Sequence, residues 1–286
     1  MIRLILKIVG ILYLGSAPGW AQGPFASFER ASEAVLDDPH DLAIGPDGRL
    51  YVADKFANRI TILDADSLEI VDAIEDAALF GVHDISFGPD GRAYIAATGA
   101  SALVVFDVQT DPAELIFGLR GFPRTEGALA HSNGTVYVMA SGVGALIAVA
   151  GTEVTGQAGG FFGAHDVAEG LDGSIWVADN NAQRLVQLNT DLEVIKVLDD
   201  AKFGFIGPRY LDVDDFGRLV VADQDAHRIL LIDPETETLL GVLGDGTPGI
   251  GPNKFDDPEG VAVNANTYYF SDSNNNRIVK YVVVTN

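Results

Sequence analysis

Six polar residues recur at one position of a repeated sequence motif, and their types suit a metal or ligand site. Each stands at the start of a short apolar run, and successive members are 39 to 50 residues apart. In chain order they are His40, His83, Glu126, His165, Arg209 and Glu259. We call these six the column residues. The apolar residues recur in every copy, so we expect them to form the core of the fold. Because the column residue is polar in every copy, we expect the six column residues to form a site.

The three histidines of the column are the expected metal ligands. Zinc takes three protein ligands in catalytic sites and leaves a fourth place for water or substrate. His40, His83 and His165 could supply those ligands, with zinc as the first choice and magnesium or calcium as alternatives. Glu126 is expected as a further ligand or a base, and Asp166 as a second group that could move a proton.

The remaining column residues suggest an organic ligand beside the metal. Arg209 is permanently cationic and could hold a carboxylate or phosphate as a catalytic group, unless acidic neighbours neutralise it. Tyr210 and Glu259 are the expected ligand-binding residues. A hydrated channel mouth, polar only because it meets solvent, is the competing interpretation, and the column alone does not decide between the two.

The elements that must position the column are short β-strands. After each apolar run comes a turn such as Gly45-Pro46-Asp47-Gly48, and then a β-rich run such as Leu50–Asp54. Two further strand-like runs complete most repeats. Six such units predict an all-β fold, a six-bladed β-propeller. Since the first strand of every blade lines the channel, all six column residues should meet at one mouth.

The chain ends predict how the ring closes. The last repeat has only three strand-like runs, so one strand is missing from the sixth blade. Residues 22–36 precede the first repeat, and Phe25 to Arg30 within them could supply the missing strand and remove an exposed sheet edge. We therefore expect a closing strand in residues 22–36 and the propeller in residues 37–286.

The first 21 residues resemble a secretory signal peptide. Arg3 and Lys7 precede an apolar stretch, and the small residues Gly19 and Ala21 mark a cleavage site near Ala21. The apolar stretch is too short to span a bilayer. The chain has no cysteine, which suits a bacterial periplasm or the medium better than a disulfide-stapled ectodomain. A periplasmic or secreted monomer is expected.

The net charge narrows the range of partners. At −23 the chain lacks the basic surface that nucleic acids and anionic membranes require. No segment outside the leader is long and apolar enough for membrane insertion. A small-molecule or peptide ligand at the channel mouth is the partner that remains.

A motif in four of the repeats resembles the NHL repeat. It consists of an Asp followed five residues later by an Arg and then Ile or Leu, at Asp54 to Ile60, Asp179 to Leu185, Asp223 to Ile229 and Asp272 to Ile278. The second and third repeats have alanines at these positions. The resemblance covers roughly residues 37–286 and implies an NHL-type six-bladed propeller whose Asp and Arg fasten the turn between strands 2 and 3.

Two enzyme families resemble the chain in its column. Pro39-His40-Asp41 is similar to the zinc-binding blade starts of peptidyl-hydroxyglycine amidating lyases, although that family has its histidines on alternate blades. The resemblance implies His40, His83 and His165 as ligands, with Asp41, Asp84 or Asp166 in an acidic role. Streptogramin lyases are similar in their Gly-Pro-Asp-Gly turns and imply a His/Glu-bound magnesium. A metal-dependent lyase is thus expected, with a non-catalytic binding scaffold of the cell envelope as the alternative.

Overall fold

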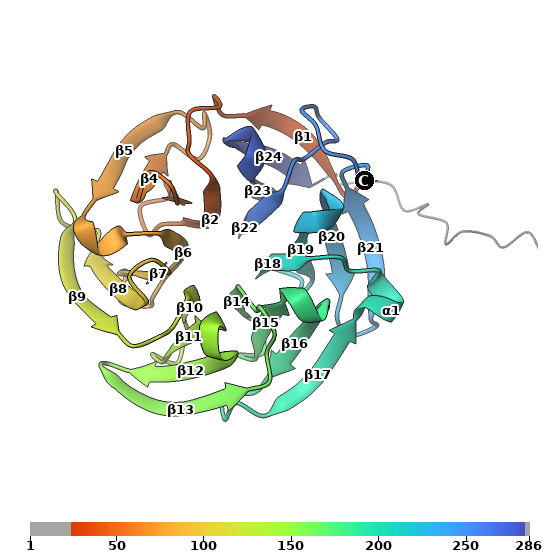
Figure 1. Cartoon of the computed structure of the whole chain (residues 1–286). Coiled ribbons are helices and arrows are strands. Elements are labelled where there is room, and N and C mark those ends of the chain that lie inside the picture. Colours follow the sequence, from red (N-terminus) through yellow and green to blue (C-terminus); the bar gives the residue numbers. More distant parts are fainter. Residues whose placement is uncertain (1–23, 284–286) are drawn as a thin grey trace, which may run out of the picture.

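The computed structural model describes residues 24–283 as six four-stranded antiparallel sheets around one central channel (Figure 1). The predicted all-β, six-bladed propeller is confirmed. The signal peptide predicted in residues 1–21 lies outside the described residues. No helix within residues 24–283 has the length and apolar character needed to cross a membrane.

Each blade has an inner, a second, a third and an outer strand. The inner strands are β2 (Pro39–Ile44), β6 (Val82–Phe87), β10 (Thr125–Ala130), β14 (Val167–Glu169), β18 (Pro208–Val213) and β22 (Pro258–Asn264). The second strands are β3 (Leu50–Asp54), β7 (Ala93–Ala97), β11 (Val136–Ala140), β15 (Ile175–Asp179), β19 (Leu219–Asp223) and β23 (Thr267–Asp272). The third strands are β4 (Arg59–Leu63), β8 (Ala102–Asp107), β12 (Ala145–Ala150), β16 (Arg184–Leu188), β20 (Arg228–Asp233) and β24 (Arg277–Val283). The outer strands are β5 (Ile70–Glu75), β9 (Glu114–Arg120), β13 (Glu153–Gly159), β17 (Val194–Asp199), β21 (Thr238–Leu243) and β1 (Ala26–Ala31).

Helical turns are short and lie in the loops. They are η1 (Ala77–Leu79), η2 (Ser141–Val143), η3 (Asn180–Ala182), η4 (Gln224–Ala226), η5 (Ser273–Asn275) and the single α-helical turn α1 (Asp200–Phe203). Loops between strands 2 and 3 and loops between blades open on one face, the mouth face, which is toward the viewer in Figure 1.

The sixth blade combines both ends of the described chain. β1 pairs antiparallel with β24, and Ala26 is opposite Val283. Phe28 packs edge-on against Tyr281 with ring centroids 5.7 Å apart, which adds a side-chain contact to the backbone ladder. This pairing leaves β24 with neighbours on both sides.

The turns between strands 1 and 2 form as their sequence predicts. Gly48 adopts a positive φ of 79°, a conformation that is costly for residues with a Cβ atom. Asp47 accepts a hydrogen bond from the Arg49 amide at 3.0 Å and another from the Tyr51 hydroxyl at 3.0 Å. These turns lie on the face opposite the mouth.

In four blades the NHL aspartate connects the blade to the loop that enters it. Asp179 is fully buried, and its Oδ2 accepts a hydrogen bond from Arg184 Nε at 2.8 Å. Its other oxygen, Oδ1, accepts the Phe162 amide at 2.6 Å. Asp54, Asp223 and Asp272 hold the amides of their entering loops in the same way. The motif therefore fixes the loop that leads to the column, as well as the turn between strands 2 and 3.

Candidate functional site

Backbone irregularities direct the column residues toward the channel axis. In five blades the column residue is the second residue of the inner strand, and the strand register breaks at that residue. His165 is the exception, because it lies two residues before β14. A bulge re-aims a side chain that regular pairing would place against a neighbouring sheet.

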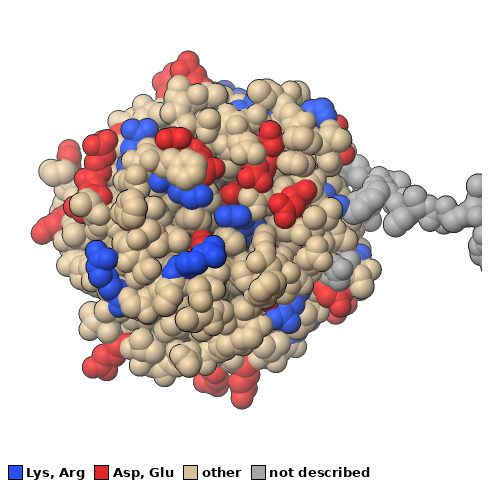
Figure 2. Space-filling view, in the orientation of Figure 1, with Lys and Arg blue, Asp and Glu red and all other residues tan. Residues whose placement is uncertain are grey.

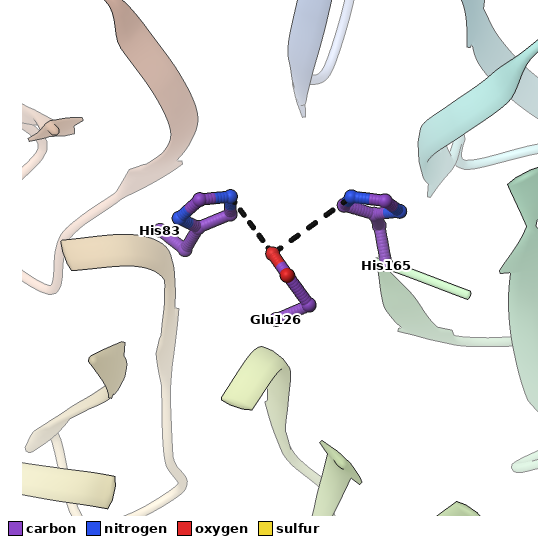
Figure 3. A group of neighbouring side chains, drawn as sticks. All are labelled: His83, Glu126 and His165. Carbon is purple, nitrogen blue, oxygen red and sulfur yellow. Dashed lines mark ion pairs between the residues drawn. The ribbon is translucent and has the colours of Figure 1, made fainter. Parts of the chain in front are cut away.

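Three column residues form a compact group that could hold a metal ion. The possible ligand atoms of His83, Glu126 and His165 all lie within 4.8 Å of one another (Figure 3). Glu126 Oε2 is 2.8 Å from His83 Nε2 and 3.8 Å from His165 Nε2. The three residues come from consecutive blades, and their side chains are at most 7 % exposed. Both imidazoles point toward the same carboxylate.

Neighbouring groups orient this cluster. Arg124 donates to Glu126 Oε1 from Nε at 3.2 Å and from Nη2 at 2.9 Å, which leaves Oε2 toward the histidines. His165 Nδ1 lies 2.7 Å from the Gly163 carbonyl, an acceptor, so Nδ1 carries the proton and Nε2 presents a lone pair. Glu126 Oε2 is buried and has no hydrogen-bond partner, because its contact with His83 lacks hydrogen-bond alignment.

Electrostatics keep both imidazoles neutral. Burial, followed by the charge of His40, lowers the pKa of His83 to about 4. Burial, followed by the charge of Arg209, lowers the pKa of His165 to about 3. Burial acts to raise the pKa of Glu126, but the contacts with His83, His165 and Arg124 outweigh it and hold that pKa well below its usual range. Two neutral imidazoles and one carboxylate are a suitable donor set for a divalent cation.

His40 lies beside this group but interacts with other partners. Its ring centroid is 4.2 Å from that of His83, while its Nδ1 is 2.5 Å from Glu259 Oε2. On the other side, Asp38 Oδ2 is 3.2 Å and Lys55 Nζ is 2.9 Å from Nε2. Burial lowers the pKa of His40, yet Glu259 and Asp38 raise it on balance. The structure thus brings together two of the three expected histidine ligands with Glu126, and places His40 in an ion-pair network.

Arg209 and Glu259 are linked through a residue that the sequence analysis did not single out. Arg209 Nη1 donates to Gln224 Oε1 at 2.8 Å, and Gln224 Nε2 donates to Glu259 Oε1 at 2.8 Å. Arg209 Nε is 3.4 Å from Glu259 Oε2 but has no hydrogen-bond partner of its own among the described residues. Gln224 directly follows the NHL residue Asp223, and that position on the mouth face is the signal that could have identified it.

Tyr210 supports the histidines from within the channel. It is fully buried, and its hydroxyl donates to the His83 carbonyl at 3.1 Å. Its ring lies 6.4 Å from that of His40 and 6.5 Å from that of His165. The Tyr210 hydroxyl therefore hydrogen-bonds to the backbone of His83, one of the candidate metal ligands.

Asp166 belongs to a second layer of carboxyl groups deeper in the channel. Its Oδ2 accepts the Leu211 amide at 2.7 Å, and burial raises its pKa to about 6. Asp41 and Asp84 similarly accept amides from the inner strand of the next blade, and burial raises both of their pKa values well above the usual range. With Asp212, which the sequence analysis missed, they line a cavity of about 320 Å³. This layer joins neighbouring blades.

Comparison with known proteins gives one family match. A family described as a domain of unknown function (DUF5074) matches residues 40–203, more than half of the chain. No match was found among curated proteins.

Solved structures with a similar fold include two lyases and a synthase. Virginiamycin B lyase from Staphylococcus aureus superposes with a TM-score of 0.67 at 12 % identity, covering 90 % of this chain and 100 % of its own. A streptogramin B lyase gives a TM-score of 0.64 at 14 % identity, covering 94 % of this chain and 90 % of its own. Kuenenia stuttgartiensis hydrazine synthase gives 0.64 at 15 % identity, covering 88 % and 97 %. At these identities the similarity shows the propeller fold.

Proposed function

The chain belongs to the DUF5074 family, and we propose that it functions through its channel mouth, where His83, Glu126 and His165 hold a divalent metal beside a small-molecule or peptide ligand. Zinc is the first candidate, because two imidazoles and one glutamate are a common protein ligand set of catalytic zinc sites. Lyase chemistry is the proposed reaction, and the similarity in fold to streptogramin B lyase supports it only at the level of architecture.

A single atom, Glu126 Oε2, carries the proposal. Buried polar atoms in folded proteins nearly always have a partner, because an unsatisfied one costs free energy. Glu126 Oε2 has no hydrogen-bond partner, although two imidazole Nε2 atoms face it at 2.8 and 3.8 Å. A cation between these atoms would satisfy all three.

The spacing of the three atoms is compatible with such an ion. Zinc ligands at about 2.0–2.2 Å in tetrahedral geometry lie about 3.3 Å from one another. The observed separations of Glu126 Oε2 from the two Nε2 atoms fall on either side of that value. Small side-chain adjustments would therefore be enough for binding.

The chain itself would supply the rest of the chemistry. A divalent ion, when bound, would polarise a carbonyl or acidify a bound water. Arg124 holds Glu126 in place, and Tyr210 holds the backbone of His83. Arg209 would bind an anionic group of the ligand. Asp166 is the proposed proton-moving residue, because burial brings its pKa close to neutrality, at about 6.

A non-catalytic binding scaffold is the second candidate. The half of the mouth formed by His40, Glu259 and Arg209 is paired within the protein, as a purely structural polar mouth would be. The two candidates differ in their response to metal. A metal site should raise the melting temperature in zinc, magnesium or calcium, since a ligand of the native state stabilises it. His83→Ala should remove that shift, whereas a scaffold would show no shift in either protein.

We also propose export and a monomeric state. The leader-like features of residues 1–21 support removal near Ala21 and a periplasmic or secreted location. N-terminal sequencing of the protein from its native cells should begin at Gln22. A start at Met1 would contradict export, and a dimer mass in solution would contradict the monomer.

A further inference from the structure

The mouth face carries exposed apolar side chains beside the candidate metal group. In four blades an NHL aspartate holds the amide of the residue three positions before the column residue, and Phe162 and Ile206 are held in this way. In blades 2 to 5 this residue is apolar and exposed: Phe80, Pro123, Phe162 and Ile206. In blades 6 and 1 it is acidic, Asp256 and Asp37. We call the four apolar residues the apolar rim.

The apolar rim lies on the side of the mouth that the metal group occupies. His83, Glu126 and His165 head blades 2, 3 and 4, and Arg209 heads blade 5. Phe80, Phe162 and Ile206 are 51–66 % exposed, and all three stand at the same position of their blades on the mouth face. Figure 2 shows the same asymmetry, with acidic side chains over the upper half of the face and few over the lower half except at its edge.

Basic groups surround the centre of this face. Several Lys and Arg side chains lie close to the centre in Figure 2, on a chain whose net charge is −23. The Arg209 side chain is 18 % exposed there, and its Nε has no hydrogen-bond partner among the described residues. Arg124 and Lys55 contact the column residues Glu126 and His40. Glu259, Glu126 and Asp38 pair with these three cations, so a bound divalent ion would supply the excess positive charge that suits an anion.

The burial of the centre determines how a ligand could bind. His83, Glu126 and His165 are at most 6 % exposed, so only a small group such as a carboxylate could reach them. The body of the ligand must then lie outside, on the rim. We propose that the ligand is an organic carboxylate with an apolar body, whose carboxylate meets Arg209 and the metal group and whose body packs on Phe80, Phe162 and Ile206. This inference rests on the proposed metal site.

Calorimetric titration of the zinc-loaded mature protein with acetate, butanoate and octanoate tests the inference. Affinity should rise about two- to fourfold for each added methylene, because burying apolar surface is favourable. Neutral 1-octanol should bind at least tenfold more weakly than octanoate. Equal affinity for acetate and octanoate, or for octanol and octanoate, would overturn the inference. Binding to anionic lipid vesicles without binding of monomeric octanoate would also overturn it, in favour of a lipid surface.

Matched variants locate the ligand. Phe162→Ser and Phe80→Ser should weaken octanoate at least fivefold and leave acetate unchanged. Phe216→Ser is the control, because Phe216 is 76 % exposed in the turn after β18, on the opposite face. An equal loss in the control would contradict a ligand on the rim. Zinc content measured in the same samples separates the two proposals: bound zinc without chain-length dependence refutes this inference alone, and absent zinc refutes the metal site.

Discussion

His40 Nδ1 lies 2.5 Å from Glu259 Oε2, although the two residues stand at opposite ends of the propeller sequence. The contact joins the first blade to the sixth, where β1 also pairs with β24. It also separates His40 chemically from His83 and His165. Glu259 Oε2 and Glu126 Oε2 are both buried without a hydrogen-bond partner, but acidic neighbours raise the pKa of His40, whereas burial lowers the pKa values of His83 and His165.

This separation predicts different titration behaviour for the three histidines. Glu259 and Asp38 raise the pKa of His40 above the ordinary histidine value of 6.5, although burial acts to lower it. Burial lowers the pKa of His83 to about 4 and that of His165 to about 3. In NMR titrations of the metal-free protein, His40 should titrate above pH 6.5, and the other two should remain neutral at pH 5. Three similar midpoints near 6.5 would show that the mouth is open to water.

The same shifts predict that metal binding resists acid. Protons compete with a metal for imidazole nitrogen only when the pH approaches the imidazole pKa. Since those values are about 4 and about 3, zinc affinity should stay nearly constant from pH 7.5 to pH 5 and fall below that. A steep loss of affinity between pH 7 and pH 6, measured by competition with a chelator of known affinity, would contradict the low pKa values.

The buried channel carboxyl Asp212 should make stability depend on pH. Burial raises its pKa from 3.8 to about 7. A raised acid pKa means that the folded state binds more protons than the unfolded state, so stability is lost as the pH rises from about 4 to 7. Between pH 5 and pH 8, the wild type should lose on the order of 2–4 kcal/mol relative to Asp212→Asn, which cannot ionise. Urea unfolding at both pH values measures this, and parallel pH dependences would refute it.

The NHL pair Asp179–Arg184 should contribute more to stability than a surface pair. Asp179→Ala removes the acceptor of both the Arg184 guanidinium and the Phe162 amide, at a cost of about 1–3 kcal/mol. Arg184→Ala should cost less, because the Phe162 amide keeps its acceptor. Lys202→Ala breaks the exposed pair with Glu237 and should cost under about 1 kcal/mol. A double-mutant cycle without coupling between positions 179 and 184 would show that the two side chains act independently.

Deletion of residues 22–31 should lower the melting temperature by about 10 °C or more. The deletion removes β1 and exposes the edge of β24 and the ring of Tyr281. Each kcal/mol of lost stability lowers the melting temperature by about 2–4 °C for a chain of this size. Deletion of residues 22 and 23 alone, which leaves β1 intact, is the control. Equal melting curves for the two deletions would show that β1 is dispensable for closure.

The repeat made the fold predictable, but it did not predict which partners each of the six column residues contacts. The apolar frame and the turns at Gly45–Gly48 recur, so six blades and one shared mouth follow from the sequence. The separation of His40 from His83 depends on Asp38 and Lys55, which contact it only in the folded chain. Asp212 was missed because nothing in its local sequence distinguishes a buried channel carboxyl from a surface residue, whereas the position of Gln224 directly after Asp223 is a signal that could have been used.

The metal content of the dialysed protein tests the central claim most directly. If His83, Glu126 and His165 hold one ion, the wild type should retain about one zinc per chain after exposure to zinc and dialysis. His83→Ala, Glu126→Gln and His165→Ala should each lose it, whereas His40→Gln and His227→Ala should retain it, because neither of these residues belongs to the group. Elemental analysis of the six proteins measures this. Zinc lost in His40→Gln but kept in Glu126→Gln would favour three histidine ligands, and no zinc in the wild type would contradict a metal site at this mouth.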